Sequence, residues 1–284
     1  MTGPAGGERH AHPLVPDYPP ELFRGTAGYY SRFRPRYPPV LLDAIERTVG
    51  LDQASSLLDL ACGTGEVSLA LADRVAGIWA IDSEPEMVAV ARQNALDRGV
   101  GRVHWLVGRA EEADLPEDHF GLVAVGRAFH RLNRPLIARR STRWLRRGGY
   151  FIDLGADSSG LAEPGEPWLA AAAEVYRRWL PRARRSRDDV RSRADPGQPE
   201  ATSQAILNEA GFTQVAKYEF AVPHVWEVGQ FIGYLCSTSY SSRDFWGEAW
   251  AGFELDLRNT LAALAPAGLL TETISAYFVA GRHE

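Results

Sequence analysis

The sequence predicts an α/β fold, with a doubly wound, mostly parallel sheet and a helical cap. Strand-like and helical patterns alternate over the first half of the chain. The strand-like runs are almost continuously apolar, which is typical of parallel strands covered by helices on both faces. The alternation stops after residue 154, where longer helical patterns begin. The length of 284 residues fits one large domain that carries an insert.

Five short runs are apolar and partly β-branched or aromatic, as buried strands are. They cover residues 57–61, 78–82, 103–107, 122–125 and 150–154. Helices are expected between them at 66–75, 84–98 and 135–147. For the second of these helices we expect Ser83 as the N-cap, with Glu86 completing a capping box. Pro85 lies in its first turn, and Gly99 follows its last residue.

The remaining segments predict a tail, a cap and two further strands. Residues 1–25 are rich in Pro and Gly and are expected to be a flexible tail, followed by the core at 26–159. The cap is expected at 160–265, interleaved with a sixth strand at about 214–222, and residues 266–284 complete the sheet. Helices are expected at 167–180, 201–210, 225–236 and 245–264, and an arginine-rich stretch occupies 182–193.

Composition excludes several classes of protein. The net charge is 31 − 36 = −5, which argues against a general nucleic-acid binder. The two cysteines, Cys62 and Cys236, provide neither a disulfide framework nor a zinc site. No apolar run approaches the roughly 18 residues of a membrane span, and the N-terminus lacks a signal-peptide core. We therefore expect a cytoplasmic monomer or homodimer that binds no metal, nucleic acid or membrane.

The most informative segment is residues 57–66, LLDLACGTGE. An apolar strand enters a Gly-x-Gly turn and then a helix, so the backbone can turn tightly and a ligand can approach it closely. Asp82 ends the next strand, where its carboxylate can accept hydrogen bonds from ribose hydroxyls. Together these residues predict a nucleoside site at the carboxyl ends of the strands.

Two residues distinguish this turn from the dinucleotide-binding fingerprint. That fingerprint places a third glycine where this chain has Ser68. It also has no use for Asp59, whose charge repels a pyrophosphate but suits a ligand with an ammonium group. S-adenosylmethionine is such a ligand, since it joins adenosine to a zwitterionic methionine through a sulfonium. The alternative is a turn with incidental acidic residues.

Three motifs carry a resemblance to a known family: residues 58–65 (LDLACGTG), 81–87 (IDSEPEM) and 108–111 (GRAE). They are similar to successive motifs of the class I S-adenosylmethionine-dependent methyltransferases, in particular a bacterial small-molecule branch of the type 11 kind. The likeness covers about residues 25–155, and the last two strands fit that family's seven-stranded, Rossmann-like sheet.

The resemblance implies a role for each motif residue. Asp59, Gly63 and Gly65 would hold the methionine part of the cofactor, and Asp82 would hold the ribose. Met87 would pack on the adenine.

The same resemblance places Ala110 at the adenine edge, and Ala61, Ser83 and Gly126 complete the expected contacts. Many members carry Asp where this chain has Arg109. Since arginine cannot accept a hydrogen bond, Glu111 or backbone carbonyls would have to accept from the adenine amino group.

The segment 29–38 (YYSRFRPRYP) also resembles the segment that precedes the core in this branch. Arg34 or Arg32 could hold the methionine carboxylate, and Tyr30 could face the sulfonium. The alternative is the start of an ordinary amphipathic helix with solvated arginines.

Candidate acceptor residues follow the fourth strand and lie in the cap. Phe129 and His130 come just past that strand, and we expect His130 to act as a base or to orient the acceptor. The resembling branch has Phe-His-Trp at this point, whereas this chain has Arg131 in place of the Trp. His224 is the second candidate base. A pocket for a flat or glycosylated acceptor would be lined by Trp226, Tyr234 and Tyr240. The alternatives are a loop histidine that binds backbone groups and aromatic packing within the cap.

These observations predict an enzyme that transfers a methyl group from S-adenosylmethionine to oxygen or nitrogen of a small organic acceptor, in bacterial secondary metabolism. A methyltransferase for RNA or protein and a non-catalytic S-adenosylmethionine-binding protein remain alternatives. An NAD-dependent oxidoreductase is disfavoured by Ser68 and Asp59.

Overall fold

The protein contains a seven-stranded sheet with the strand order β3-β2-β1-β4-β5-β7-β6. A computed structural model describes residues 25–158, 161, 165–183, 201–238 and 240–284. The strands are β1 (Ser56–Leu60), β2 (Gly77–Asp82), β3 (Val103–Val107), β4 (Phe120–Gly126), β5 (Leu145–Asp157), β6 (Thr213–Glu227) and β7 (Leu269–Arg282). Strands β1 to β5 are parallel, and β7 is antiparallel to both of its neighbours. The predicted doubly wound α/β fold is therefore confirmed.

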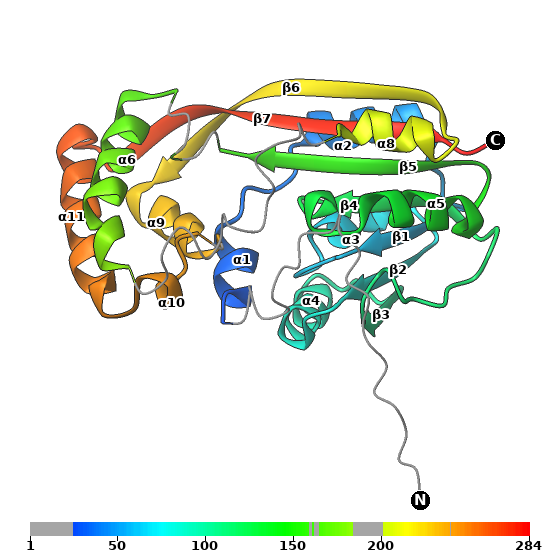
Figure 1. Cartoon of the computed structure of the whole chain (residues 1–284), viewed down its shortest axis with the longest axis horizontal. Helices are drawn as coiled ribbons and strands as arrows, with labels where there is room; N and C mark the ends of the chain where they lie inside the picture. Colours follow the sequence, from blue (N-terminus) through cyan, green and yellow to red (C-terminus); the bar gives the residue numbers. More distant parts are fainter. Residues whose placement is uncertain (1–24, 159–160, 162–164, 184–200, 239) are drawn as a thin grey trace, which may run out of the picture.

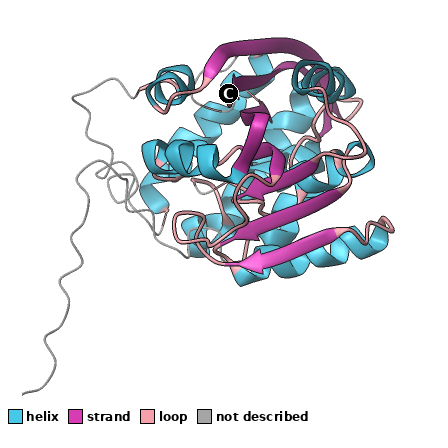
Figure 2. Ribbon diagram, turned by 90° about the vertical axis from the view of Figure 1, so that its right-hand side faces the viewer, coloured by secondary structure: helices cyan, strands magenta, loops and turns pink. Residues whose placement is uncertain are grey.

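Helices cover both faces of this sheet (Figure 2). On one face lie α2 (Pro39–Val49), α3 (Glu66–Ala70) and α4 (Pro85–Asp97), and on the other α5 (Arg134–Trp144) and α8 (Ser203–Glu209). Each face has its own core cluster, built from alternate side chains of the same strands. The nearly continuous apolar strands thus bury both faces, as the sequence predicted.

The cap has a third, separate core. It comprises α6 (Pro167–Trp179), α9 (Val228–Cys236), α10 (Arg243–Trp246) and α11 (Trp250–Leu264), packed through aromatic and aliphatic side chains. Strands β6 and β7 run from the main sheet into this cap, and α1 (Ala27–Phe33) lies between the cap and α4 (Figure 1). Helix α8 falls within the range expected to form the cap, but it packs on β6 and β7 of the main sheet.

Several boundaries differ from the prediction. The edge strand β6 continues to Glu227, so residues 225–227 are extended and not helical. The helix expected at 245–264 is broken at Gly247, whose φ of 55° marks the left-handed region. The helix expected at 66–75 ends at Ala70. Helices α1 and α2 were not assigned from the sequence.

The predicted start of α4 is also wrong. Glu84, not Ser83, is the N-cap, and neither residue caps the helix with a side-chain hydrogen bond in the described structure. Glu86 instead accepts a hydrogen bond from Gly25 N at 2.8 Å. Pro85 and Gly99 occupy the expected positions at the two ends. The tail before residue 25 and the arginine-rich stretch beyond residue 183 lie outside the described residues.

Candidate functional site

The glycine turn after β1 has the backbone conformation that its residues predict. Gly63 and Gly65 have φ values of 54° and 83°, and Ala61 adopts 53° although it carries a side chain. A Cβ on Gly65 would stand 2.9 Å from the indole of Trp105. Gly65 is therefore required for packing of the turn against β3, while Ala61 and Gly63 line a cavity.

Asp82 connects the end of β2 to this turn. Its Oδ2 accepts a hydrogen bond from Gly63 N at 2.8 Å, and its Oδ1 accepts one from Glu84 N at 2.9 Å. Burial raises the pKa of this carboxyl, while the two backbone donors oppose the shift. The carboxylate lines the same cavity and is fixed in place before any ligand arrives.

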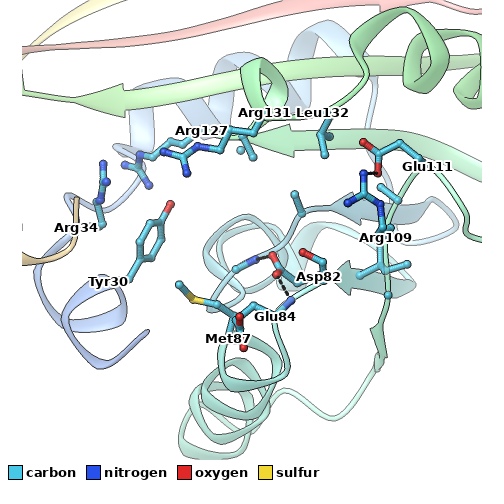
Figure 3. Close-up of a pocket in the computed structure, with 18 residues that line it drawn as sticks. Tyr30, Arg34, Asp82, Glu84, Met87, Arg109, Glu111, Arg127, Arg131 and Leu132 are labelled. Carbon is cyan, nitrogen blue, oxygen red and sulfur yellow. Dashed lines mark hydrogen bonds and ion pairs between the residues drawn. The ribbon is translucent and has the colours of Figure 1, made fainter. Parts of the chain in front are cut away.

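The cavity lies at the carboxyl ends of the strands and has a volume of about 170 Å³. In Figure 3, Tyr30 and Arg34 stand at one end, Arg109 and Glu111 at the other, and Asp82 between them. The lining includes all the expected cofactor contacts except Asp59 and Gly65: Tyr30, Arg34, Ala61, Gly63, Asp82, Ser83, Met87, Ala110, Glu111 and Gly126. One cavity thus joins residues that are far apart in the sequence.

Asp59 lies behind the turn and does not line the cavity. Its carboxylate is fully buried, and Oδ2 accepts hydrogen bonds from Ser68 N at 3.0 Å and Ser68 Oγ at 2.6 Å. This pairing explains why a serine stands where the dinucleotide fingerprint has a glycine. Burial raises the pKa of Asp59 to about 7, and its Oδ1 has no hydrogen-bond partner among the described residues. The expected direct contact between Asp59 and the ligand is corrected to support of the turn.

Arg34 closes one end of the cavity from the C-cap of α1. Its guanidinium pairs with Asp157 at 3.0 Å and lies over the rings of Tyr30 and Tyr234. The buried Nε of Arg34 has no hydrogen-bond partner within the described part of the chain. Arg32, the other candidate, is exposed and lies over Phe33. Of the two candidate arginines, Arg34 lines the cavity and Arg32 does not.

Arg127 is a site residue that the sequence reasoning missed. It has a φ of 55°, and its side chain is 4% exposed. It pairs with Glu66 and Asp157, each at 3.2 Å, and donates to the carbonyl oxygens of Pro35 and Ala156. The available signal was a charged residue directly after a buried strand, at the edge where ligands bind in open α/β sheets.

Glu111 lies at the opposite end of the cavity from Arg34 (Figure 3), and Met87 and Ala110 also line the cavity. Met87 and Ala110 are buried, and Glu111 Oε1 accepts a hydrogen bond from Asn133 N at 3.1 Å. Arg109 also lines this end and pairs with Glu111 at 3.7 Å. A carboxylate acceptor is therefore available beside the arginine.

The residues after β4 separate into core and surface. Phe129 is buried, 5.2 Å from the ring of Phe151, so its expected role against the acceptor is wrong. His130 lies in the short helix η2 (Phe129–Arg131) and accepts a hydrogen bond from Arg131 Nε at 3.1 Å. Partial burial and the neighbouring cations lower the pKa of His130 to about 4. The role of His130 as a base stays a prediction. It requires that the hydrogen bond from Arg131 Nε break, so that His130 Nε2 can accept a proton from the acceptor.

The cap aromatics pack together and do not line the described cavity. Trp226 lies on β6, is buried, and donates to Glu272 Oε1 at 2.6 Å. His224 lies on the same strand, 4.3 Å from the Trp226 ring. Tyr234 is buried in the cap core under Arg34, whereas Tyr240 is partly exposed. In the described part of the chain these side chains do not line the cavity at the glycine turn, so an acceptor pocket formed by them stays a prediction.

Within the described ranges, no cluster of three or more His, Cys, Asp or Glu side chains is arranged to hold a metal ion. No helix in these ranges is long and apolar enough to cross a membrane.

Comparison with known proteins agrees with the fold. Residues 57–149 match the family model described as a methyltransferase domain. An uncharacterized methyltransferase of Mycobacterium tuberculosis is 35% identical over 127 residues, which cover 45% of this chain and 49% of that protein. The human tRNA (uracil-5-)-methyltransferase homolog A is 41% identical over 73 residues, covering 26% of this chain and 12% of that protein. The chain spans about half the length, or less, of these curated relatives.

A solved structure shows the same architecture over nearly the whole chain. The structure of a candidate type II methyltransferase from Anaeromyxobacter dehalogenans has a TM-score of 0.60 and 21% identity, and covers 88% of this chain and 98% of that one. The strand order, the antiparallel seventh strand and the cavity define a Rossmann-like methyltransferase fold. A methyltransferase domain therefore lies at residues 57–149, and the described fold is that of the Rossmann-like methyltransferases.

Proposed function

We propose that this protein transfers a methyl group from S-adenosylmethionine to an oxygen or nitrogen atom of a small organic acceptor. The observation that carries the proposal is the cavity in which the glycine turn, Asp82 and Arg34 meet. Each Asp82 oxygen accepts one backbone hydrogen bond and keeps capacity for a ribose hydroxyl.

The remaining lining fits the other parts of this cofactor. The unpartnered Nε of Arg34 can donate to the methionine carboxylate. Met87 and Ala110 supply apolar surface for the adenine, and Glu111 can accept from its amino group. When bound, S-adenosylmethionine supplies a methyl group already activated by the sulfonium. The protein then has to hold the acceptor in line and exclude water.

A small acceptor is supported by the net charge of −5, which disfavours a polyanionic acceptor such as RNA. A base is needed only for an acceptor that is protonated at neutral pH, and His130 is the candidate adjacent to the cavity. The proposal includes a role in bacterial secondary metabolism and a cytoplasmic location. The match to the human tRNA methyltransferase homolog covers 12% of that protein, so its acceptor is not carried over.

Calorimetry with S-adenosylhomocysteine tests the cofactor assignment. Asp82→Asn should weaken binding by about 1–3 kcal/mol, because one acceptor for the ribose hydroxyls is lost. Asp114→Asn, a change of an exposed carboxylate, is the matched control and should leave the affinity unchanged. Unchanged affinity in Asp82→Asn would remove this residue from the site.

Transfer of a tritiated methyl group tests the acceptor class. Incubation with a low-molecular-weight extract, and separately with total RNA, should label the small-molecule fraction. Label that appears only in acid-precipitable RNA would overturn the small-acceptor proposal.

A further inference from the structure

Asp157 is the last residue of β5 and lies beyond the end of β4. Gly126, the last residue of β4, pairs with Leu154, so the three residues that follow Leu154 project past β4. The carboxylate of Asp157 binds two guanidinium groups that both line the cofactor cavity. Oδ1 pairs with Arg34 Nη1 at 3.0 Å, and Oδ2 pairs with Arg127 Nε at 3.2 Å.

The two arginines are held very differently. Arg127 is fixed by a second carboxylate, by two backbone carbonyls and by the ring of Tyr37, 4.5 Å from its guanidinium carbon. Among the described residues, Arg34 has one ion pair, donates to the carbonyl oxygen of Ser237 at 3.5 Å, and lies over the rings of Tyr30 and Tyr234. Its buried Nε has no partner among the described residues. Arg34 therefore keeps the capacity to bind a second anion, whereas Arg127 does not.

The second anion follows from the proposed function, on which this inference rests. The carboxylate of the methionine part would be placed near Arg34, at the end of the cavity opposite Glu111. Arg34 would then be shared by two carboxylates. Like charges on one guanidinium repel each other, and the interaction is little screened in a half-buried site.

We propose that Asp157 competes with the cofactor's carboxylate for Arg34 and so limits the affinity of the cavity for carboxylate-bearing ligands. The demethylated product, S-adenosylhomocysteine, keeps this carboxylate and has to leave after each turnover. If Asp157 weakens the interaction between the product's carboxylate and Arg34, the product dissociates faster. Asp157 thus sets how tightly the cavity holds both the methyl donor and its demethylated product.

Asp157 is suited to this role because it stays ionised. Arg127 and Arg34 lower the pKa of its carboxyl and outweigh the effect of burial. Arg127 holds the second oxygen, so the carboxylate remains beside Arg34. Glu66 offers a comparison, since it pairs with Arg127 at 3.2 Å, and its charge acts on Arg34 without a direct ion pair in the described part of the chain.

Calorimetry with two probes tests the competition. S-adenosylhomocysteine carries the carboxylate, whereas S-adenosyl-3-thiopropylamine keeps the amine and lacks the carboxylate. Asp157→Asn should bind S-adenosylhomocysteine about three- to tenfold more tightly, with no such gain for the amine. Glu66→Gln is the control and should show no selective gain. Weaker or unchanged binding of S-adenosylhomocysteine by Asp157→Asn would overturn the proposal, because it would show that Asp157 only positions Arg34.

A double-mutant cycle locates the effect at Arg34. In the Arg34→Gln background, Asp157→Asn should no longer strengthen binding, and an undiminished gain would contradict the competition. Retained binding of the amine shows that a variant has a folded cavity, and Asp157→Ser serves if Asp157→Asn does not fold. Failure of the unaltered protein to bind S-adenosylhomocysteine overturns the proposed function itself. Binding without the expected gain overturns only this inference.

Discussion

The buried carboxyl of Asp59 predicts an unusual dependence of stability on pH. Its pKa is raised to about 7 by burial, against about 3.9 in an unfolded chain. The folded state therefore holds this proton more tightly than the unfolded state. The contribution of Asp59 to the free energy of unfolding has its full value below about pH 4. It falls as the pH rises from about 4 to about 7, and above that range it stays constant. The difference of about three pKa units corresponds to about 4 kcal/mol.

Asp59→Asn removes this titration and keeps an acceptor for Ser68. Relative to the unaltered protein, the variant should gain up to about 4 kcal/mol in the free energy of unfolding between pH 4 and pH 8. Urea denaturation at one-unit steps of pH measures this difference. Asp153, whose pKa is raised to about 6 by burial, contributes with the same sign in both proteins and cancels.

Asp114→Asn, at an exposed position, is the control and should give a difference that does not vary with pH. Parallel stability curves for Asp59→Asn and the unaltered protein would refute the reasoning. They would show that Asp59 ionises in the folded state as easily as in the unfolded state.

Three further changes test the packing around the cavity. Ala61→Gly should raise the free energy of unfolding by about 0.5–1 kcal/mol in urea denaturation, because φ is 53° and the relief of strain exceeds the added chain entropy. Gly126→Ala should lower it by about 1–3 kcal/mol, since a Cβ would stand 2.5 Å from a methyl group of Val67, and should weaken binding of S-adenosylhomocysteine in calorimetry. Arg127→Met should lower the free energy of unfolding by about 1–3 kcal/mol, because the half-buried carboxylates of Glu66 and Asp157 lose their partner.

Each change has a control of the same chemistry. Ala54→Gly, at an exposed turn without positive φ, should not stabilise the protein. Gly101→Ala places a Cβ in open space and should be nearly neutral. Arg139→Met removes an exposed arginine and should change stability by less than about 0.5 kcal/mol. Equal effects in a variant and its control would contradict the structural explanation.

The core of the fold was predictable because local pattern and tertiary environment agree there. The strands around the glycine turn are almost continuously apolar, and both faces of the sheet are covered. The acidic residue that ends β2 lies beside the turn, since the carboxyl ends of neighbouring parallel strands share one edge. The glycine turn and Asp82 followed from these two regularities, whereas Met87, Ala110 and Glu111 were expected from the family resemblance.

The far end of β6 was not predictable in the same way. Pro223 reads as a break, and residues 225–236 were assigned to one helix. β6 is an edge strand, which tolerates a proline because one side of its backbone has no partner strand. His224 and Trp226 consequently lie on a strand, and Trp226 is buried through its pairing with Glu272.

The remaining site residues could not be predicted fully, because the sequence does not show in which direction a side chain points. The sequence places Asp59 near the ligand, but only the structure shows its carboxylate turned to Ser68 behind the turn. Phe129 follows a strand end and nevertheless turns into the core. Arg127 depends on Glu66 and Asp157, from two other elements, and such long-range pairing leaves no local pattern.

The most direct test of the central claim is a calorimetric titration of the unaltered protein with S-adenosylmethionine and, separately, with NAD. The cavity of Asp82, Arg34 and the glycine turn predicts one binding site for S-adenosylmethionine and no measurable binding of NAD. Binding of NAD without binding of S-adenosylmethionine would contradict the account.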